Sequence, residues 1–297
     1  MFIISHRNIF FAVSAVSVLF SVAAIAVGGL QFGIDFTGGS LVEVFYENGR
    51  PELSKVEERL RDSGFKDIVL QSIDDRGLLV RTETLDEASL PKMFSALSLD
   101  GKHRYEEKRL TSIGPVIGRE LKRRAFIALG VSILLTVIFI AFSFRHVSQP
   151  VSSWKYGVVA ILTLLHDVVI PTGIFVVLGR VRGAEVDTLF VTALLAILGL
   201  SINDTIVVFD RIRENLRLRV SKSFSETVGV SLKQTMGRSF NTSFTALLVL
   251  VALYLFGPHA TRDFALVLGI GLLVGAYSSI FVASPLLVEI EKRQKKK

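Results

Sequence analysis

Cysteine is absent from the 297 residues of this chain, and charged residues make up only 21% of it. The first absence excludes disulfides, thiolate metal sites and a thiol nucleophile. The scarcity of charge, together with 50% hydrophobic residues and a mean hydropathy of +0.52, excludes an ordinary soluble domain. We therefore expect a membrane protein, and we expect it to have no metal, no cofactor and no catalytic centre.

Six long uncharged runs account for the hydropathy. They lie at residues 8–30, 125–144, 168–179, 188–203, 239–257 and 264–288. Most approach the ~20 residues that cross a bilayer as a helix. The third and fourth become full spans, 156–178 and 188–209, only when ionisable residues are admitted inside them. The sequence thus predicts six transmembrane helices, two of which carry ionisable groups within the membrane.

Basic residues are distributed unevenly between the two sets of flanks. One set holds only Arg180, Arg182 and Arg262. The other holds Arg7, Arg145, Lys155, Arg211, Arg213, Arg217, Arg219, Lys222, Lys233, Arg238, Lys292, Arg293, Lys295, Lys296 and Lys297. Because cytoplasmic flanks are the basic ones, both termini are predicted in the cytoplasm. A cleaved signal peptide ending near Ala26 is the alternative, although the apolar run exceeds the ~7–15 residues of a signal core.

The segment between the first two spans has the pattern of a compact α/β domain. It holds 14 basic and 17 acidic residues over positions 31–122. Residue alternation and helical periodicity predict the order βαββαβ, with strands near 40–46, 66–73, 77–83 and 103–113 and helices at 51–63 and 86–97. This order indicates a ferredoxin-like fold. The segment has no glycine-rich loop that opens a helix and no paired metal ligands, so we expect a binding or mechanical role.

These patterns divide the chain into four parts. They are a first helix at 1–30, an extracytoplasmic α+β domain at 31–122, a five-helix membrane region at 123–290 with a cytoplasmic loop at 210–235, and a basic cytoplasmic tail at 291–297. Within the loop, Ser223 and Glu226 have the spacing of a capping box, which predicts a separate amphipathic helix at the interface. Since the basic excess belongs to the membrane flanks, we expect contact with lipids and not with nucleic acid.

Polar residues recur inside three of the predicted spans. His166 and Asp167 lie in the third, Asn203 and Asp204 in the fourth, and Arg238 in the fifth. A charge in mid-membrane costs about 2.5 to 3.5 kcal/mol on insertion scales. Asp204 and Arg238 are expected at similar depth, where a carboxylate and a guanidinium can form a proton relay. The alternatives are interhelical packing bonds for His166 and Asp167 and a snorkelling anchor for Arg238.

Two runs carry a resemblance to a known family. Residues 32–40 read FGIDFTGGS, and residues 201–215 read SINDTIVVFDRIREN. They resemble the SecD/SecF family of export membrane proteins, the second run its SecF branch. The resemblance implies six helices that form half of a resistance-nodulation-division (RND) transporter, in the bacterial inner membrane and without ATP hydrolysis. It also implies a SecD partner, the SecYEG channel and preprotein substrates, with the proton motive force as the energy source.

The resemblance further implies that Asp204 and Arg238 are the functionally important charged residues. A moving domain also requires a point at which motion is transmitted, and the glycine-rich run after the first span is the candidate hinge. The hinge candidates are Gly33, Asp35, Gly38 and Gly39.

Three other hypotheses stay open at this point. Half of a small-molecule or lipid exporter of the RND type would need an apolar substrate cleft in the 31–122 domain. An intramembrane aspartyl protease would use Asp167 and Asp204 as its dyad, but Asn203 precedes Asp204 where such proteases have glycine. A passive assembly scaffold would show no dependence of export on the proton gradient.

Overall fold

The computed structural model describes residues 2–143 and 150–295. It divides into two units, which we describe separately: a membrane unit of residues 1–31, 127–184 and 189–297, and a second unit of residues 32–126 with 185–188. Arg145, Lys296 and Lys297, which enter the prediction of orientation, lie outside the described residues.

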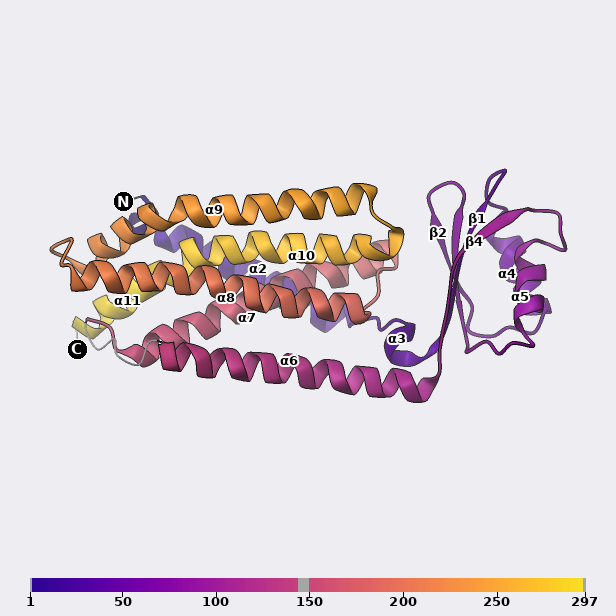
Figure 1. Cartoon of the computed structure of the whole chain (residues 1–297), viewed down its shortest axis with the longest axis horizontal. Coiled ribbons are helices and arrows are strands. Elements are labelled where there is room, and N and C mark those ends of the chain that lie inside the picture. The colour runs from indigo at the N-terminus through magenta and orange to yellow at the C-terminus, as the bar shows by residue number, and fades with distance from the viewer. Residues whose placement is uncertain (1, 144–149, 296–297) are drawn as a thin grey trace. The chain divides into compact units, whose positions relative to one another are not determined.

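Within the described residues, six helices are long and apolar enough to cross a membrane. They are α2 (Arg7–Gly28), α6 (Pro115–Ser143), α7 (Ser153–Arg182), α8 (Thr188–Arg217), α9 (Phe224–Phe256), and a last one formed by α10 (His259–Ser278), the π-helical turn η1 (Ser279–Ala283) and α11 (Ser284–Lys295). A short helix, α1 (Phe2–Ser5), precedes α2. The predicted six-span architecture is therefore confirmed (Figure 1).

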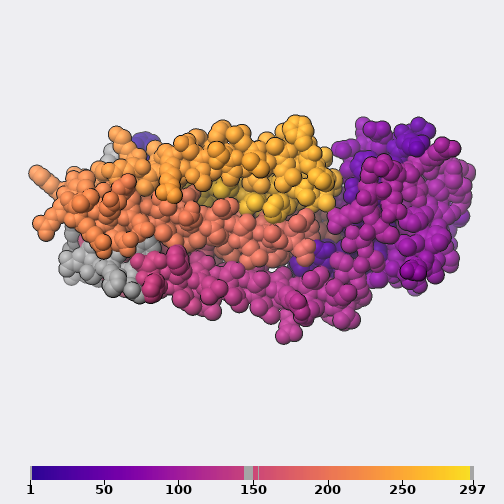
Figure 2. Space-filling model, viewed as in Figure 1, coloured from indigo at the N-terminus to yellow at the C-terminus, as the bar shows by residue number. Residues whose placement is uncertain are grey.

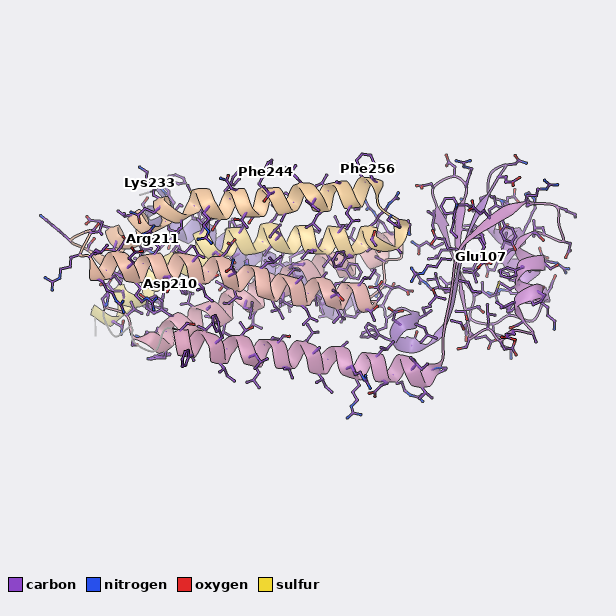
Figure 3. All side chains as sticks on the ribbon, in the orientation of Figure 1. Glu107, Asp210, Arg211, Lys233, Phe244 and Phe256 are labelled. Carbon is purple, nitrogen blue, oxygen red and sulfur yellow. The ribbon has the colours of Figure 1, made fainter. Side chains whose placement is uncertain are left out.

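The centre of the membrane unit consists of α7, α8 and α10. About half of the apolar window of each is buried, against about a tenth or less for α2, α6 and α9. Gly271 allows α10 to approach α8, because a Cβ there would lie 2.2 Å from Ile197. The outer helices expose large apolar side chains, among them Phe244 and Phe256 of α9 (Figure 3). Such exposed apolar faces are expected where lipid is the solvent.

The segment predicted as a cytoplasmic loop, 210–235, differs from its prediction. Ser223 does cap a helix, accepting a hydrogen bond from the Glu226 N–H at 3.3 Å, but this helix is α9 itself, which runs without a break to Phe256. The expected separate amphipathic helix is therefore wrong. Its buried face, which includes Leu232, continues at three- and four-residue steps through Ser239 into the membrane part, so the same helical periodicity serves both halves.

The second unit has the predicted ferredoxin-like fold. After a short helix α3 (Ile34–Thr37), its elements are β1 (Gly39–Tyr46), α4 (Leu53–Asp62), β2 (Val69–Ile73), β3 (Gly77–Thr82), α5 (Leu90–Leu97) and β4 (Tyr105–Ile113). The strands pair in the order β2-β3-β1-β4, all antiparallel. Both long helices lie on one face of the sheet (Figure 1). Val42 and Val80, which pair across β1 and β3, are fully buried in the core beneath them.

Candidate functional site

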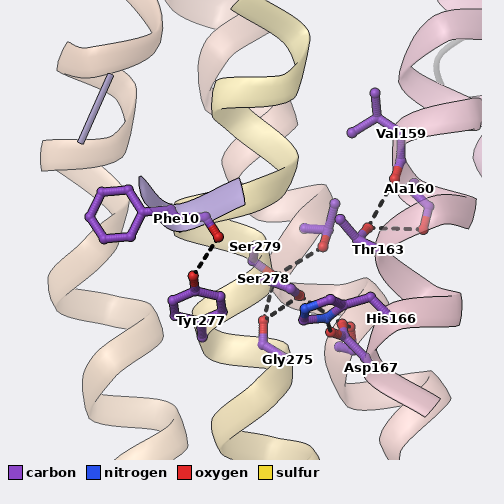
Figure 4. Close-up of polar contacts among 12 residues, drawn as sticks. Phe10, Val159, Ala160, Thr163, His166, Asp167, Gly275, Tyr277, Ser278 and Ser279 are labelled. Atoms are coloured by element: carbon purple, nitrogen blue, oxygen red, sulfur yellow. Dashed lines mark hydrogen bonds and ion pairs between the residues drawn. The ribbon is translucent and has the colours of Figure 1, made fainter. Parts of the chain in front are cut away.

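The most deeply buried charged group of the membrane unit is the carboxylate of Asp167 on α7, which has no exposed surface. It accepts hydrogen bonds from three side chains (Figure 4). The Ser278 hydroxyl of α10 donates at 2.7 Å, His166 Nδ1 lies at 2.8 Å, and the Ser201 hydroxyl of α8 completes the set. Because one carboxylate binds groups from α8 and α10 as well as α7, it holds the three central helices together.

His166 extends this cluster toward α2. Its ring stacks on Tyr277 with centroids 6.4 Å apart, and the Tyr277 hydroxyl donates to the Phe10 carbonyl of α2 at 3.0 Å. His166 Nε2 is buried and has no hydrogen-bond partner among the described residues. The neutral ring with the proton on Nδ1 therefore fits this site best, since it donates to Asp167 and leaves no buried N–H unsatisfied.

Two backbone irregularities flank the cluster. Pro171 lies inside α7, four residues after Asp167, and lacks the N–H that would bind the Asp167 carbonyl. The π-helical turn begins at Ser279, directly after Ser278, and the Ser279 hydroxyl lies 2.9 Å from that of Thr205 on α8. Such turns are frequent at functional sites. The sequence analysis did not single out these two serines as site residues, because small residues near Gly271 and Gly275 indicate close helix packing without indicating a hydrogen-bond partner.

Asp204 lies one turn after Ser201 on α8 and is half-buried. Both residues line a void of about 10 Å³ against Gly271 and Gly275 of α10, which is about the least space that can hold one water molecule. Arg238 of α9 is exposed and lies close enough for its charge to act on Asp204. The two side chains, both among the described residues, do not form a direct ion pair. The structure thus brings Asp204 next to the Asp167 cluster, with Arg238 at a greater distance.

Polar side chains are exposed on the outside of α8 and α9. Asn203 of α8 is exposed, as are Arg238 and Asn241 of α9. Figure 1 shows α10 between these two helices, and in Figure 2 the three helices are visible together with α6. A cation and two amides facing hydrocarbon are unfavourable unless another protein covers them. No group of three His, Asp or Glu side chains that could hold a metal occurs in the described ranges.

The predicted hinge residues occupy defined positions in the second unit. Asp35 Oδ2 accepts from the Thr188 N–H at 2.9 Å and from its hydroxyl at 2.6 Å, and the Gly33 N–H donates to the Val186 carbonyl at 2.9 Å. Gly38 and Gly39 have φ angles of +80° and +125°, which residues other than glycine rarely adopt. The two glycines are therefore required by the backbone path that leads from α3 into β1.

The fold and the site together define a six-span membrane protein with a ferredoxin-like domain between its first two spans and an ionisable cluster at the centre of its helices. The family model of the SecD/SecF export membrane proteins, C-terminal part, matches residues 95–293, and that of the SecD/SecF GG motif matches residues 23–47. The chain belongs to this family and is a multi-pass membrane protein.

Relatives support this assignment. The SecF protein translocase subunit of Thermobaculum terrenum is 40% identical, over 98% of this chain and 94% of its own length. The crystal structure of SecDF, a translocon-associated membrane protein from Thermus thermophilus, matches with a TM-score of 0.84 at 33% identity; the match covers 98% of this chain but only 38% of SecDF. A structure of SecDF in its super-membrane-facing form gives a TM-score of 0.65 at 32% identity and the same coverage.

Proposed function

We propose that the chain is a SecF subunit of the bacterial inner membrane, with both termini in the cytoplasm, that uses the proton motive force to promote preprotein export together with SecD and the SecYEG channel. The observation that carries this proposal is the chain of ionisable and hydroxyl groups from Asp204 to Asp167 and His166 in a member of this family. The role is mechanical rather than enzymatic.

The geometry supports a proton relay of this kind. Asp204 and Ser201 line the same small void, and Ser201 donates directly to Asp167. His166 then extends the path, because its Nδ1 lies 2.8 Å from Asp167. Asp204, Asn203 and Arg238 face the surface, so protons would reach this chain there and not through its centre.

The energy available to such a relay is sufficient for a mechanical task. One charge that crosses about 100 mV releases about 2.3 kcal/mol. This corresponds to a shift of about fiftyfold in a two-state equilibrium, at about 1.4 kcal/mol per factor of ten. The two solved forms of SecDF support the existence of two states, because they match the same share of this chain with TM-scores of 0.84 and 0.65.

The exposed polar surface supports a partner chain. Asn203, Arg238 and Asn241 would face lipid in an isolated subunit, and this chain matches only 38% of the single-chain SecDF. The remaining length of such a fused chain has room for a SecD-like half. We therefore propose that SecD covers this surface and completes the proton path at Asp204.

The test is export by membrane vesicles that contain Asp204→Asn as the only copy of this chain. We expect loss of the gradient-stimulated part of export with the complex still assembled, while Asp210→Asn, at the exposed end of the same helix, exports like the wild type. Vesicles reconstituted with the wild-type chain and without SecD should conduct no protons. Wild-type export by Asp204→Asn, or a gradient-driven activity of the chain without SecD, would refute the proposal.

A further inference from the structure

The first turn of α8 is bound by residues far away in the sequence. Thr188 is the first residue of α8, and the N–H groups of a first helical turn have no acceptor within the helix. Asp35, 153 residues earlier, accepts from both the N–H and the hydroxyl of Thr188. Its negative charge also suits the positive end of the helix dipole. The aspartate of the FGIDFTGG run thus acts as a capping residue for α8.

Two more contacts join the same two segments, and an ion pair joins the second segment to the sheet. Phe32 and Val186 form a parallel β-bridge, and the Gly33 N–H binds the Val186 carbonyl. Glu185 forms an ion pair with Arg81 of β3, and their side chains are only 20% and 14% exposed. Burial lowers the pKa of Arg81 to about 10, so the guanidinium is still charged at neutral pH. The segment 185–188 is therefore attached both to the run after the first span and to the central part of the sheet.

The start of α6 packs against the other side of this run. A Cβ on Gly38 would lie 2.8 Å from the Pro115 Cα, and one on Gly118 would lie 2.8 Å from the Gly38 nitrogen. The Lys122 ammonium lies 3.7 Å from the centre of the Phe32 ring. We call the three segments 32–39, 114–122 and 185–188 the exit clamp. All of them belong to the ferredoxin-like unit.

We propose that the exit clamp moves as one body, and that Asp35 is the positioning residue that makes the ferredoxin-like domain follow α8. This inference rests on the proposed function, in which displacement starts at Asp204 on the same helix. Bending within residues 32–40 would break the hydrogen bonds of Asp35 and Gly33 to the segment 185–188. If the exit clamp stays closed, these hydrogen bonds are kept, and a displacement of α8 moves the ferredoxin-like domain with it. The hinge predicted from the sequence and the clamp thus make opposite predictions.

The first test uses Asp35→Ala with wild-type SecD in proteoliposomes and in export vesicles. We expect gradient-stimulated export to fall by about tenfold. This factor is equivalent to about 1.4 kcal/mol, which is typical of a lost N-cap. Proton conduction should stay within about twofold of wild type. Asp35→Asn, which keeps an acceptor oxygen, should restore most of the export. A purely structural role would reduce conduction and export together.

The matched control is Asp86→Ala. Asp86 accepts from the Ser89 N–H at 2.9 Å in the same domain but lies outside the clamp, so its loss should leave gradient-stimulated export intact. Wild-type export by Asp35→Ala, or an equal loss in Asp86→Ala, would overturn the inference. Either result can be told apart from failure of the proposed function, because that failure would appear as wild-type export by Asp204→Asn.

The second test locks the clamp. Because the chain has no native cysteine, Phe32→Cys with Val186→Cys gives a single defined disulfide between bridge partners, whose strands lie ~4.8 Å apart. We expect the oxidised and reduced forms of this double variant to export at the same rate, within about twofold. Export that stops on oxidation and returns on reduction would establish the hinge and refute the clamp.

Discussion

Replacement of Asp167 by asparagine tests whether the buried carboxylate holds the central helices together. The wild-type oxygens accept from three donors: Oδ1 from His166, and Oδ2 from Ser201 and Ser278. An asparagine side chain has one oxygen and one NH2 group, so it offers a single acceptor atom. If its oxygen faces His166, the hydroxyls of Ser201 and Ser278 have to accept from the NH2 group and lose the charged acceptor to which they donate in the wild type. If the NH2 group faces His166, the ring proton has to move to Nε2, which is buried without a partner among the described residues.

The magnitude follows from the bonds that are lost. A hydrogen bond to a charged group contributes about 1.5 to 3 kcal/mol, and an unsatisfied buried N–H costs about 1 to 3 kcal/mol. Removal of a buried charge offsets part of this sum, so we expect a destabilisation of about 2 to 4 kcal/mol. For a chain of this size this lowers the Tm by roughly 5 to 15 °C.

The assay is thermal unfolding of the purified full chain in detergent, followed by far-UV circular dichroism. Ser278→Ala removes one of the three donors and should show a smaller decrease than Asp167→Asn. Asp210→Asn is the control, because Asp210 forms a solvent-accessible ion pair with Arg213, whose side chains are 49% and 29% exposed, and ion pairs near the surface contribute about 0 to 1 kcal/mol. A Tm of Asp167→Asn equal to that of Asp210→Asn would refute a structural role for the buried carboxylate.

Two further predictions concern the ferredoxin-like domain. Gly39→Ala should destabilise the domain by about 3 kcal/mol or more in denaturant unfolding, because φ is +125° and the new Cβ would lie 2.8 Å from the Thr82 carbonyl oxygen. Gly49 is the control, because its φ is +88° but no atom lies within 4 Å of the added Cβ, so Gly49→Ala should cost only about 1 kcal/mol. Equal effects of the two substitutions would contradict this account. The hydrogen bond from Arg59 lowers the pKa of Asp100 in the folded domain. The pair therefore stabilises the domain at pH values above the pKa of an unfolded aspartate, which is near ~4. This stabilisation disappears as the pH falls through the lower pKa that Asp100 has in the folded state. Protease resistance measured from neutral to acidic pH should therefore fall at low pH less steeply in Asp100→Asn than in wild type, and identical profiles would exclude the effect.

Much of the architecture was predictable because its signals are local. The apolar runs predicted the six spans. Alternation of apolar and polar residues in the strands, with helical periodicity between them, predicted the βαββαβ order that the sheet confirms. The separate amphipathic helix was wrong because a capping box marks where a helix begins but not where it ends. No glycine or proline pair interrupts α9 between Ser223 and the membrane part, so the helix simply continues.

The contacts of the candidate site were not predictable in the same way. Asp167 and Ser278 are 111 residues apart, and a polar residue in a span indicates that a partner exists without identifying it. The pairing of Asp204 with Arg238 stays a prediction, because an argument from depth does not fix the direction in which a side chain points. Asp35 presented the same problem, since its partner Thr188 is 153 residues away.

Several of these residues lie on or contact one helix, α8. Near its start α8 is held by Asp35, in its middle Ser201 binds Asp167, and Asp204 lies about 24 Å along the helix from Thr188 at 1.5 Å per residue. Opposite Ser201, α10 presents Gly275, where a Cβ would lie only 3.1 Å from the serine. This close approach lets Ser201 reach Asp167, so the packing of α10 and the hydrogen bond to Asp167 hold the middle of α8 together. A change of charge at Asp204, one turn further along, would act next to this hydrogen bond and next to the contact of Thr205 with Ser279. An axial shift of α8 would therefore have to break or rearrange both.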